Sequence, residues 1–104
     1  MMSLDLVVLG NDGRPERDVQ IGVHQHARLM ELVNARGASL FQRLHDYYED
    51  ALFEVSDLEA LAEEGRSLAG LAGDDTELMQ ILEGVLTLVA FAKEKGKPIE
   101  ALAD

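Results

Sequence analysis

The sequence contains no cysteine and no tryptophan, and only two of its residues are proline. Without cysteine there is neither a disulfide framework nor a thiolate site, so we expect packing alone to hold the fold together. The same absence favours a reducing compartment, and we expect a cytoplasmic protein, although it is also compatible with the periplasm. The N-terminal stretch lacks the basic region of a secretory signal, and Asp5 interrupts its apolar run.

Long apolar runs and positive charge are scarce as well. The longest apolar stretch, residues 81–92, contains Glu83 and is shorter than the roughly 20 residues that span a bilayer, so we expect no membrane segment. Nine Lys and Arg residues stand against twenty Asp and Glu residues, a net charge of −11. Nucleic-acid binders need cations to displace the counterions of the phosphate backbone, so the composition argues against a nucleic-acid ligand.

What remains is the composition of an ordinary globular protein. The apolar fraction is 47%, too high for a disordered acidic tail. The length of 104 residues and the absence of a polar linker predict a single domain, residues 1–104.

The first third of the chain predicts a β-hairpin followed by a helix. Apolar residues alternate over residues 4–9, and again at Val19, Ile21 and Val23 within residues 18–23. Asn, Asp and Gly at residues 11–13 are typical of the turn between two antiparallel strands. Residues 24–36 then have helical periodicity, with Ala27, Met30 and Val33 on the expected buried stripe and Gly37 as the C-terminal cap.

The remainder predicts two more helices. Residues 38–55 are ambiguous, and we expect an irregular or short helical piece followed by an extended run at 51–55. Ser56 and Glu59 have the spacing of a capping box, so a helix should start at Ser56 and end near Leu71. Residues 76–95 form an apolar belt wider than one stripe. Residues 99–104 are compatible with an edge strand or one more helical turn.

These elements together predict an α+β fold, in which an N-terminal antiparallel hairpin, with a third short strand as an option, packs against three helices.

The most one-signed stretch lies in the middle of the chain. Between Arg43 and Arg66 there are eight carboxylates, no Lys or Arg, and both tyrosines of the protein. Tyr supplies contact area at little entropic cost and carboxylates meet cations across an interface, so we predict a contact patch for a basic protein partner. The predicted patch consists of Asp46, Tyr47, Tyr48, Glu49, Asp50, Glu54 and Asp57. The alternative is a solvated face on which one Tyr fills the edge of the core.

No catalytic or metal chemistry is predicted. His24 and His26 fall at a strand-to-helix junction, where a spacing of two residues does not align both rings for zinc. The trio Asp46, Glu49 and Asp50 lacks the ligand spacing and central Gly of an EF-hand loop. No nucleophile elbow or glycine-rich phosphate loop is present, so we expect neither an enzyme nor a cofactor.

The order of strand, turn, strand, helix, acidic aromatic centre and helical tail resembles small acidic immunity proteins of bacterial polymorphic and type VI secreted toxin systems. The residues that carry the resemblance are Ser3-Leu4-Asp5-Leu6, Leu40 to Asp50 and Gly96-Lys97-Pro98-Ile99. The resemblance implies a cytoplasmic bacterial protein that binds a cognate toxin and blocks its active site through carboxylates. The alternative function is that of a small regulatory or adaptor protein, which would act through the apolar helix 76–95 as a homodimer or partner-binding surface.

Overall fold

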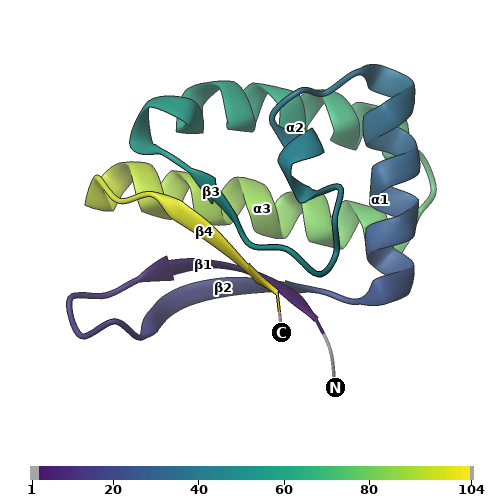
Figure 1. Cartoon of the computed structure of the whole chain (residues 1–104). Helices are drawn as coiled ribbons and strands as arrows, with labels where there is room; N and C mark the ends of the chain where they lie inside the picture. Colours follow the sequence, from purple (N-terminus) through teal and green to yellow (C-terminus); the bar gives the residue numbers. More distant parts are fainter. Residues whose placement is uncertain (1–2, 104) are drawn as a thin grey trace.

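The computed structural model describes residues 3–103 and confirms the α+β fold (Figure 1). A four-stranded antiparallel sheet, in the order β2-β1-β4-β3, packs against three helices. The strands are β1 (Leu4–Leu9), β2 (Pro15–Ile21), β3 (Ala51–Phe53) and β4 (Ile99–Ala103). The helices are α1 (Val23–Arg36), α2 (Leu58–Ala72) and α3 (Thr76–Lys95), and the short 3-10 segments are η1 (Phe41–Leu44) and η2 (Val55–Asp57).

The predicted hairpin is present, with a longer second strand. Leu4 pairs with Ile21 and Leu6 with Val19, which turns these apolar side chains towards the helices. β2 ends at Ile21, so the prediction that Val23 continues the strand is wrong. The backbone N–H of Gly22 donates a hydrogen bond to Oε1 of Gln25, and α1 starts at Val23. The side chain of Val23 is therefore 53% exposed.

The optional third strand is β3, and the last strand is an inner one. β4 pairs with β1 through Leu6 and Ala101 and with β3 through Phe53 and Ile99. A strand was one of the two alternatives expected for residues 99–104, and residues 99–103 do form one, but its expected place at the edge of the sheet is wrong, as is the alternative of a helical turn. The composition of β4, IEALA, explains the error, because Ala and Glu are poor strand formers and the pairing comes from its neighbours.

α1 buries the predicted stripe except at its first position. Met30 and Val33 are buried as expected, and Gly37 closes the helix in the left-handed conformation with φ of 73°. Ala27, however, is exposed, and the residue before it, His26, is buried instead. The polarity of His26 concealed this position from a pattern based on apolar residues.

The start of α2 also differs from the prediction. The predicted capping box of Ser56 and Glu59 does not form. Oδ2 of Asp57 instead accepts the backbone N–H of Glu54 at 3.0 Å. The segment η2 then leads into α2, which starts at Leu58. Glu54 and Asp57 are three residues apart, as are Ser56 and Glu59. This earlier pair forms because Arg43 fixes the carboxylate of Asp57, while Glu59 forms an ion pair with Lys93.

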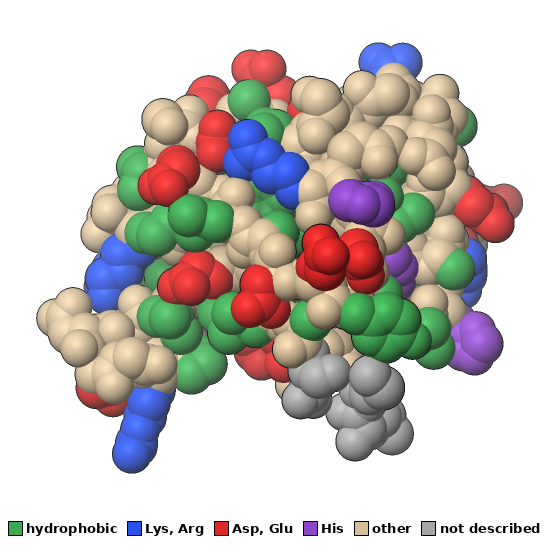
Figure 2. All heavy atoms as spheres, viewed as in Figure 1, with side chains coloured by type: hydrophobic (Ala, Val, Ile, Leu, Met, Phe, Trp, Pro, Cys, Tyr) green, Lys and Arg blue, Asp and Glu red, His purple; other side chains and the backbone are tan. Residues whose placement is uncertain are grey.

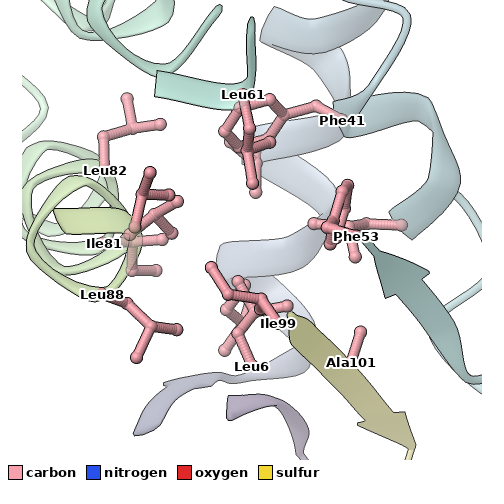
Figure 3. Close-up of a cluster of buried hydrophobic side chains, with 14 of the residues drawn as sticks. Leu6, Phe41, Phe53, Leu61, Ile81, Leu82, Leu88, Ile99 and Ala101 are labelled. Carbon is pink, nitrogen blue, oxygen red and sulfur yellow. The ribbon is translucent and has the colours of Figure 1, made fainter. Parts of the chain in front are cut away.

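α3 has the predicted bounds and lies between the sheet and α2. The side chain of Asp75 accepts the N–H of Leu78, and Gly96 ends the helix with φ of 65°. Gly84 lets β2 approach closely, since a Cβ there would lie 3.3 Å from Val19. Figure 3 shows side chains from these helices and strands meeting in the core, among them Phe41, Phe53, Leu61, Leu82 and Ile99. No helix in the described part of the chain is long and apolar enough to cross a membrane.

Candidate protein-binding surface

The predicted patch occupies the segment that leads from η1 through β3 to η2, at one edge of the sheet (Figure 1). A tight turn begins the segment. Oδ1 of Asp46 accepts the backbone N–H of Tyr48 at 2.8 Å, and the backbone N–H of Glu49 donates to the carbonyl of Asp46. This side-chain-to-backbone turn is typical of Asp and directs the following residues outward.

The two tyrosines of the patch have opposite environments. Tyr47 is 7% exposed, with its hydroxyl 3.3 Å from the carbonyl of Ile21 and its ring 5.1 Å from that of His26. Tyr48 is 65% exposed, and its ring meets that of Tyr47 edge-on at 5.4 Å. Tyr47 therefore belongs to the core, and Tyr48 is the one of the two that is accessible to a partner.

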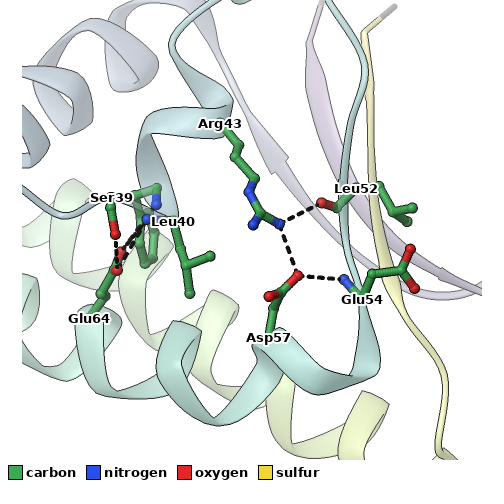
Figure 4. A network of polar contacts seen from close by, with 8 residues as sticks. Ser39, Leu40, Arg43, Leu52, Glu54, Asp57 and Glu64 are labelled. Carbon is green, nitrogen blue, oxygen red and sulfur yellow. Dashed lines mark hydrogen bonds and ion pairs between the residues drawn. The ribbon is translucent and has the colours of Figure 1, made fainter.

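Two of the predicted acids serve the fold. Asp50 accepts the backbone N–H of Ala103, which ties the segment to the end of β4. Asp57 forms an ion pair with Arg43 at 2.9 Å and accepts the backbone N–H of Glu54 (Figure 4). The hydrogen bond from Arg43, followed by that from Glu54, holds the pKa of the Asp57 carboxyl below its ordinary value.

A carboxylate outside the predicted patch holds the start of η1. Oε1 of Glu64 accepts the backbone N–H groups of Leu40 and Phe41 at 3.0 and 3.1 Å, and Oε2 accepts the hydroxyl of Ser39 (Figure 4). A carboxylate at the N-terminal end of a helical segment satisfies backbone donors that have no partner within the helix. Sequence reasoning missed this role because Glu64 lies far along the chain, on α2.

His26, on α1, contacts the end of η1 from the core side. It is buried, and its Nε2 lies 2.5 Å from the carbonyl oxygen of Leu44. With the ring of Tyr47 against it, His26 fixes the end of η1 to α1. His24 is exposed. The described residues contain no group of three or more His, Cys, Asp or Glu side chains arranged to hold a metal ion.

Most of the negative charge in the stretch remains uncompensated. Of its eight carboxylates, Asp57 pairs with Arg43 and Glu59 with Lys93, and the other six form no ion pair with the described residues. Glu49 and Glu54 are both exposed. Figure 2 shows acidic side chains across the middle of the face formed by β3 and β4.

The predicted patch lies apart from three grooves on the described surface. Three grooves lie between α2 and α3, at the junction of α1 with α2 and α3, and between β2 and α3, and none of the seven patch residues lines any of them. His45 is exposed, with Nδ1 3.0 Å from the carbonyl oxygen of Gln42. An open surface with an exposed Tyr and free carboxylates is suited to contact with another macromolecule.

Comparisons of the chain with models of protein families, with curated proteins and with solved structures found no match.

Proposed function

We propose that this protein is a non-enzymatic binding module that captures a basic protein through the exposed Tyr48 and the acids around it. The observation that carries the proposal is the position of Tyr48, 65% exposed, beside Glu49 in a segment where the only Arg partner is already used by Asp57. Asp46, Asp50 and Glu54 complete the contact surface. Tyr47, which is buried, and Asp57, which is paired with Arg43, hold this surface in place and do not contact the partner.

The physical basis is the combination of steering and contact area. A net charge of −11 attracts a positively charged protein over distances of about 10 Å and raises the association rate. At contact, the Tyr48 ring supplies an apolar surface with few rotatable bonds, and Arg is its preferred partner. Because Asp46 and Asp50 are held by backbone N–H groups, their carboxylates are ordered before the partner arrives.

The partner that fits this chemistry best is a toxin with a basic active site, which the module would block as an immunity protein does. Toxins that act on nucleic acids or nucleotides carry cations in their clefts, and a set of fixed carboxylates competes for those cations. The charge of the module and its open contact surface support this proposal.

Charge reversal on the free acids tests the proposal. The tagged protein is expressed together with the product of the neighbouring reading frame, and the complex is quantified after purification. We expect Glu49→Lys with Glu54→Lys, or Tyr48→Ala, to abolish co-purification. The matched control is Glu31→Lys with Glu83→Lys, which changes the charge equally at exposed acids on α1 and α3. Equal loss in the control, or full retention in the patch variants, would contradict the proposal.

The alternative function loses its main support on α3. The residues of α3 that stay exposed are polar apart from Ala90, and they are Thr76, Glu77, Gln80, Glu83, Thr87, Ala90, Lys93, Glu94 and Lys95. Gly84 faces Val19 of the same chain. A homodimer through α3 alone therefore has no apolar stripe to bury.

A further inference from the structure

The two aromatic rings at the surface differ in their relation to the cations of the chain. Of the five Phe and Tyr side chains, all of which the structure describes, only Phe91 and Tyr48 are not buried. Cζ of Arg17 lies 4.8 Å from the centroid of the Phe91 ring, and Nζ of Lys95 lies 5.7 Å from it. No Lys or Arg of the described chain lies over the ring of Tyr48. The more exposed ring is therefore the one to which the chain supplies no cation.

Arg43, the cation closest to Tyr48 along the chain, is already engaged. It forms an ion pair with Asp57 and donates to the carbonyl oxygen of Leu52. Its Cζ also lies 5.6 Å from the centroid of the Phe53 ring. Arg43 could reach Tyr48 only by giving up these contacts.

The ring of Tyr48 has a fixed orientation and lies next to carboxylates. It meets the ring of the buried Tyr47 at 88°, with 5.4 Å between the centroids. Oδ1 of Asp46 accepts the backbone N–H of Tyr48 at 2.8 Å, which places that carboxylate beside it. Glu49, the next residue, is exposed and forms no ion pair with any described residue. An aromatic surface and negative charge thus adjoin at one exposed turn.

We propose that Tyr48 receives the guanidinium of an arginine from the basic partner. The guanidinium lies over the ring and donates N–H groups to the carboxylate of Glu49, while Asp46 adds negative charge on the other side of Tyr48. This inference rests on the proposed function, because it names the side chain by which the partner is held.

The geometry favours arginine over lysine. A planar guanidinium stacks on a ring and, at the same time, donates N–H groups in its own plane to a carboxylate. The ammonium of lysine is a compact and more strongly hydrated charge that cannot stack in this way. Another copy of the chain is disfavoured as the source of the arginine, since each copy carries a net charge of −11.

Peptides of equal charge test the preference. Hexa-arginine and hexalysine are titrated into the protein at about 0.15 M salt, and calorimetry gives the two affinities. Tyr48→Leu should lower the affinity for hexa-arginine by about two- to fivefold, the range of a cation–π contact at an exposed site, and that for hexalysine by less. Tyr48→Phe keeps the ring and should keep both affinities. Equal losses for the two peptides in Tyr48→Leu, or the same loss in Tyr48→Phe, would overturn the inference.

The carboxylate is tested separately. Glu49→Gln should weaken the binding of hexa-arginine by up to about fivefold, because the guanidinium loses its charged acceptor. The matched control is Glu31→Gln, which removes the same charge from an exposed position on α1. Equal weakening by the two variants would show that only the net charge matters and would overturn the contact.

These measurements fail independently of the capture experiment. If charge reversal at Glu49 and Glu54 abolishes co-purification but Tyr48→Leu leaves the peptide preference unchanged, the inference is wrong and the proposed function stands. If charge reversal leaves co-purification intact, the proposed function is wrong and the inference falls with it. Sedimentation of the unmodified protein covers the remaining occupant: self-association that Tyr48→Leu abolishes would identify a second copy at Tyr48 and overturn the inference.

Discussion

Nη1 of Arg43 lies 2.9 Å from Oδ2 of Asp57 and 3.0 Å from the carbonyl oxygen of Leu52. One guanidinium thus joins η1 to β3 and to the start of α2 (Figure 4). This contact removes Asp57 from the surface charge available to a partner, although the sequence places it with the other acids of the patch. It also makes the stability of the segment depend on the ionisation of Asp57.

The first prediction concerns acid. The pKa of Asp57 is lower in the folded protein than its ordinary value of 3.8, so its contribution to stability is present above that pH and is lost as the pH falls through the lower folded-state pKa. In Asp57→Asn this contribution is absent at every pH. Its free energy of unfolding should therefore fall less steeply than that of the unmodified protein below about pH 4.

Urea unfolding at a series of pH values measures this difference. A residual slope is expected in the variant, because Lys93 lowers the pKa of Glu59 and the backbone N–H of Leu78 lowers that of Asp75. Parallel curves for the two proteins would show that Asp57 contributes nothing to the acid dependence.

The second prediction separates the two tyrosines. Tyr47→Phe removes a buried hydroxyl near the carbonyl of Ile21 and should lower the free energy of unfolding by about 1 kcal/mol. Tyr48→Phe, at an exposed position, should change it by less than about 0.5 kcal/mol. Chemical denaturation of both variants gives the comparison, and equal losses would contradict the assignment of Tyr47 to the core.

The third prediction compares neighbouring glutamates on α2. Glu64→Ala leaves the N–H groups of Leu40 and Phe41 without their acceptor and should cost about 1 kcal/mol, as the loss of a helix cap does. Glu63→Ala, at an exposed position one residue earlier, should be nearly neutral. Hydrogen exchange provides the local readout: the amides of Leu40 and Phe41 should exchange faster in the first variant alone.

The fourth prediction uses two glycines of α2. Gly70→Ala should stabilise the protein by up to about 1 kcal/mol, because Ala is the better helix former and the space around Gly70 is open. Gly65→Ala should gain less or destabilise, since its Cβ would lie 3.0 Å from Leu86. Thermal unfolding orders the variants, and a larger gain at Gly65 would show that Leu86 moves aside without cost.

The elements that the sequence predicted well are those with a local cause. α3 has its expected bounds because Asp75 caps one end and Gly96 the other, and the β1–β2 hairpin follows from alternation around an Asn-Asp-Gly turn. For β4 a strand was one of two alternatives, and its inner position was not predicted because its place between β1 and β3 depends on residues some fifty and a hundred positions away.

The candidate surface was also predicted only in part, because the sequence shows its composition but not its long-range contacts. Composition alone identified the acidic stretch, and the exposed Tyr48, Glu49 and Glu54 lie within it. Composition could not divide Tyr47 from Tyr48, since they are adjacent and identical. Their difference comes from His26 and Ile21, which lie more than twenty residues earlier and receive only one of the two rings.

The hydrogen bond from Arg43 to Leu52 has a further consequence for solubility. β3 is the last strand of the sheet, and a bare edge strand with an exposed Leu can recruit strands from other molecules. Arg43 engages a main-chain carbonyl of that strand with a charged side chain, while Glu54 just beyond β3 adds repulsion between like copies. The same short segment that offers a surface to a basic partner thereby discourages aggregation when no partner is bound.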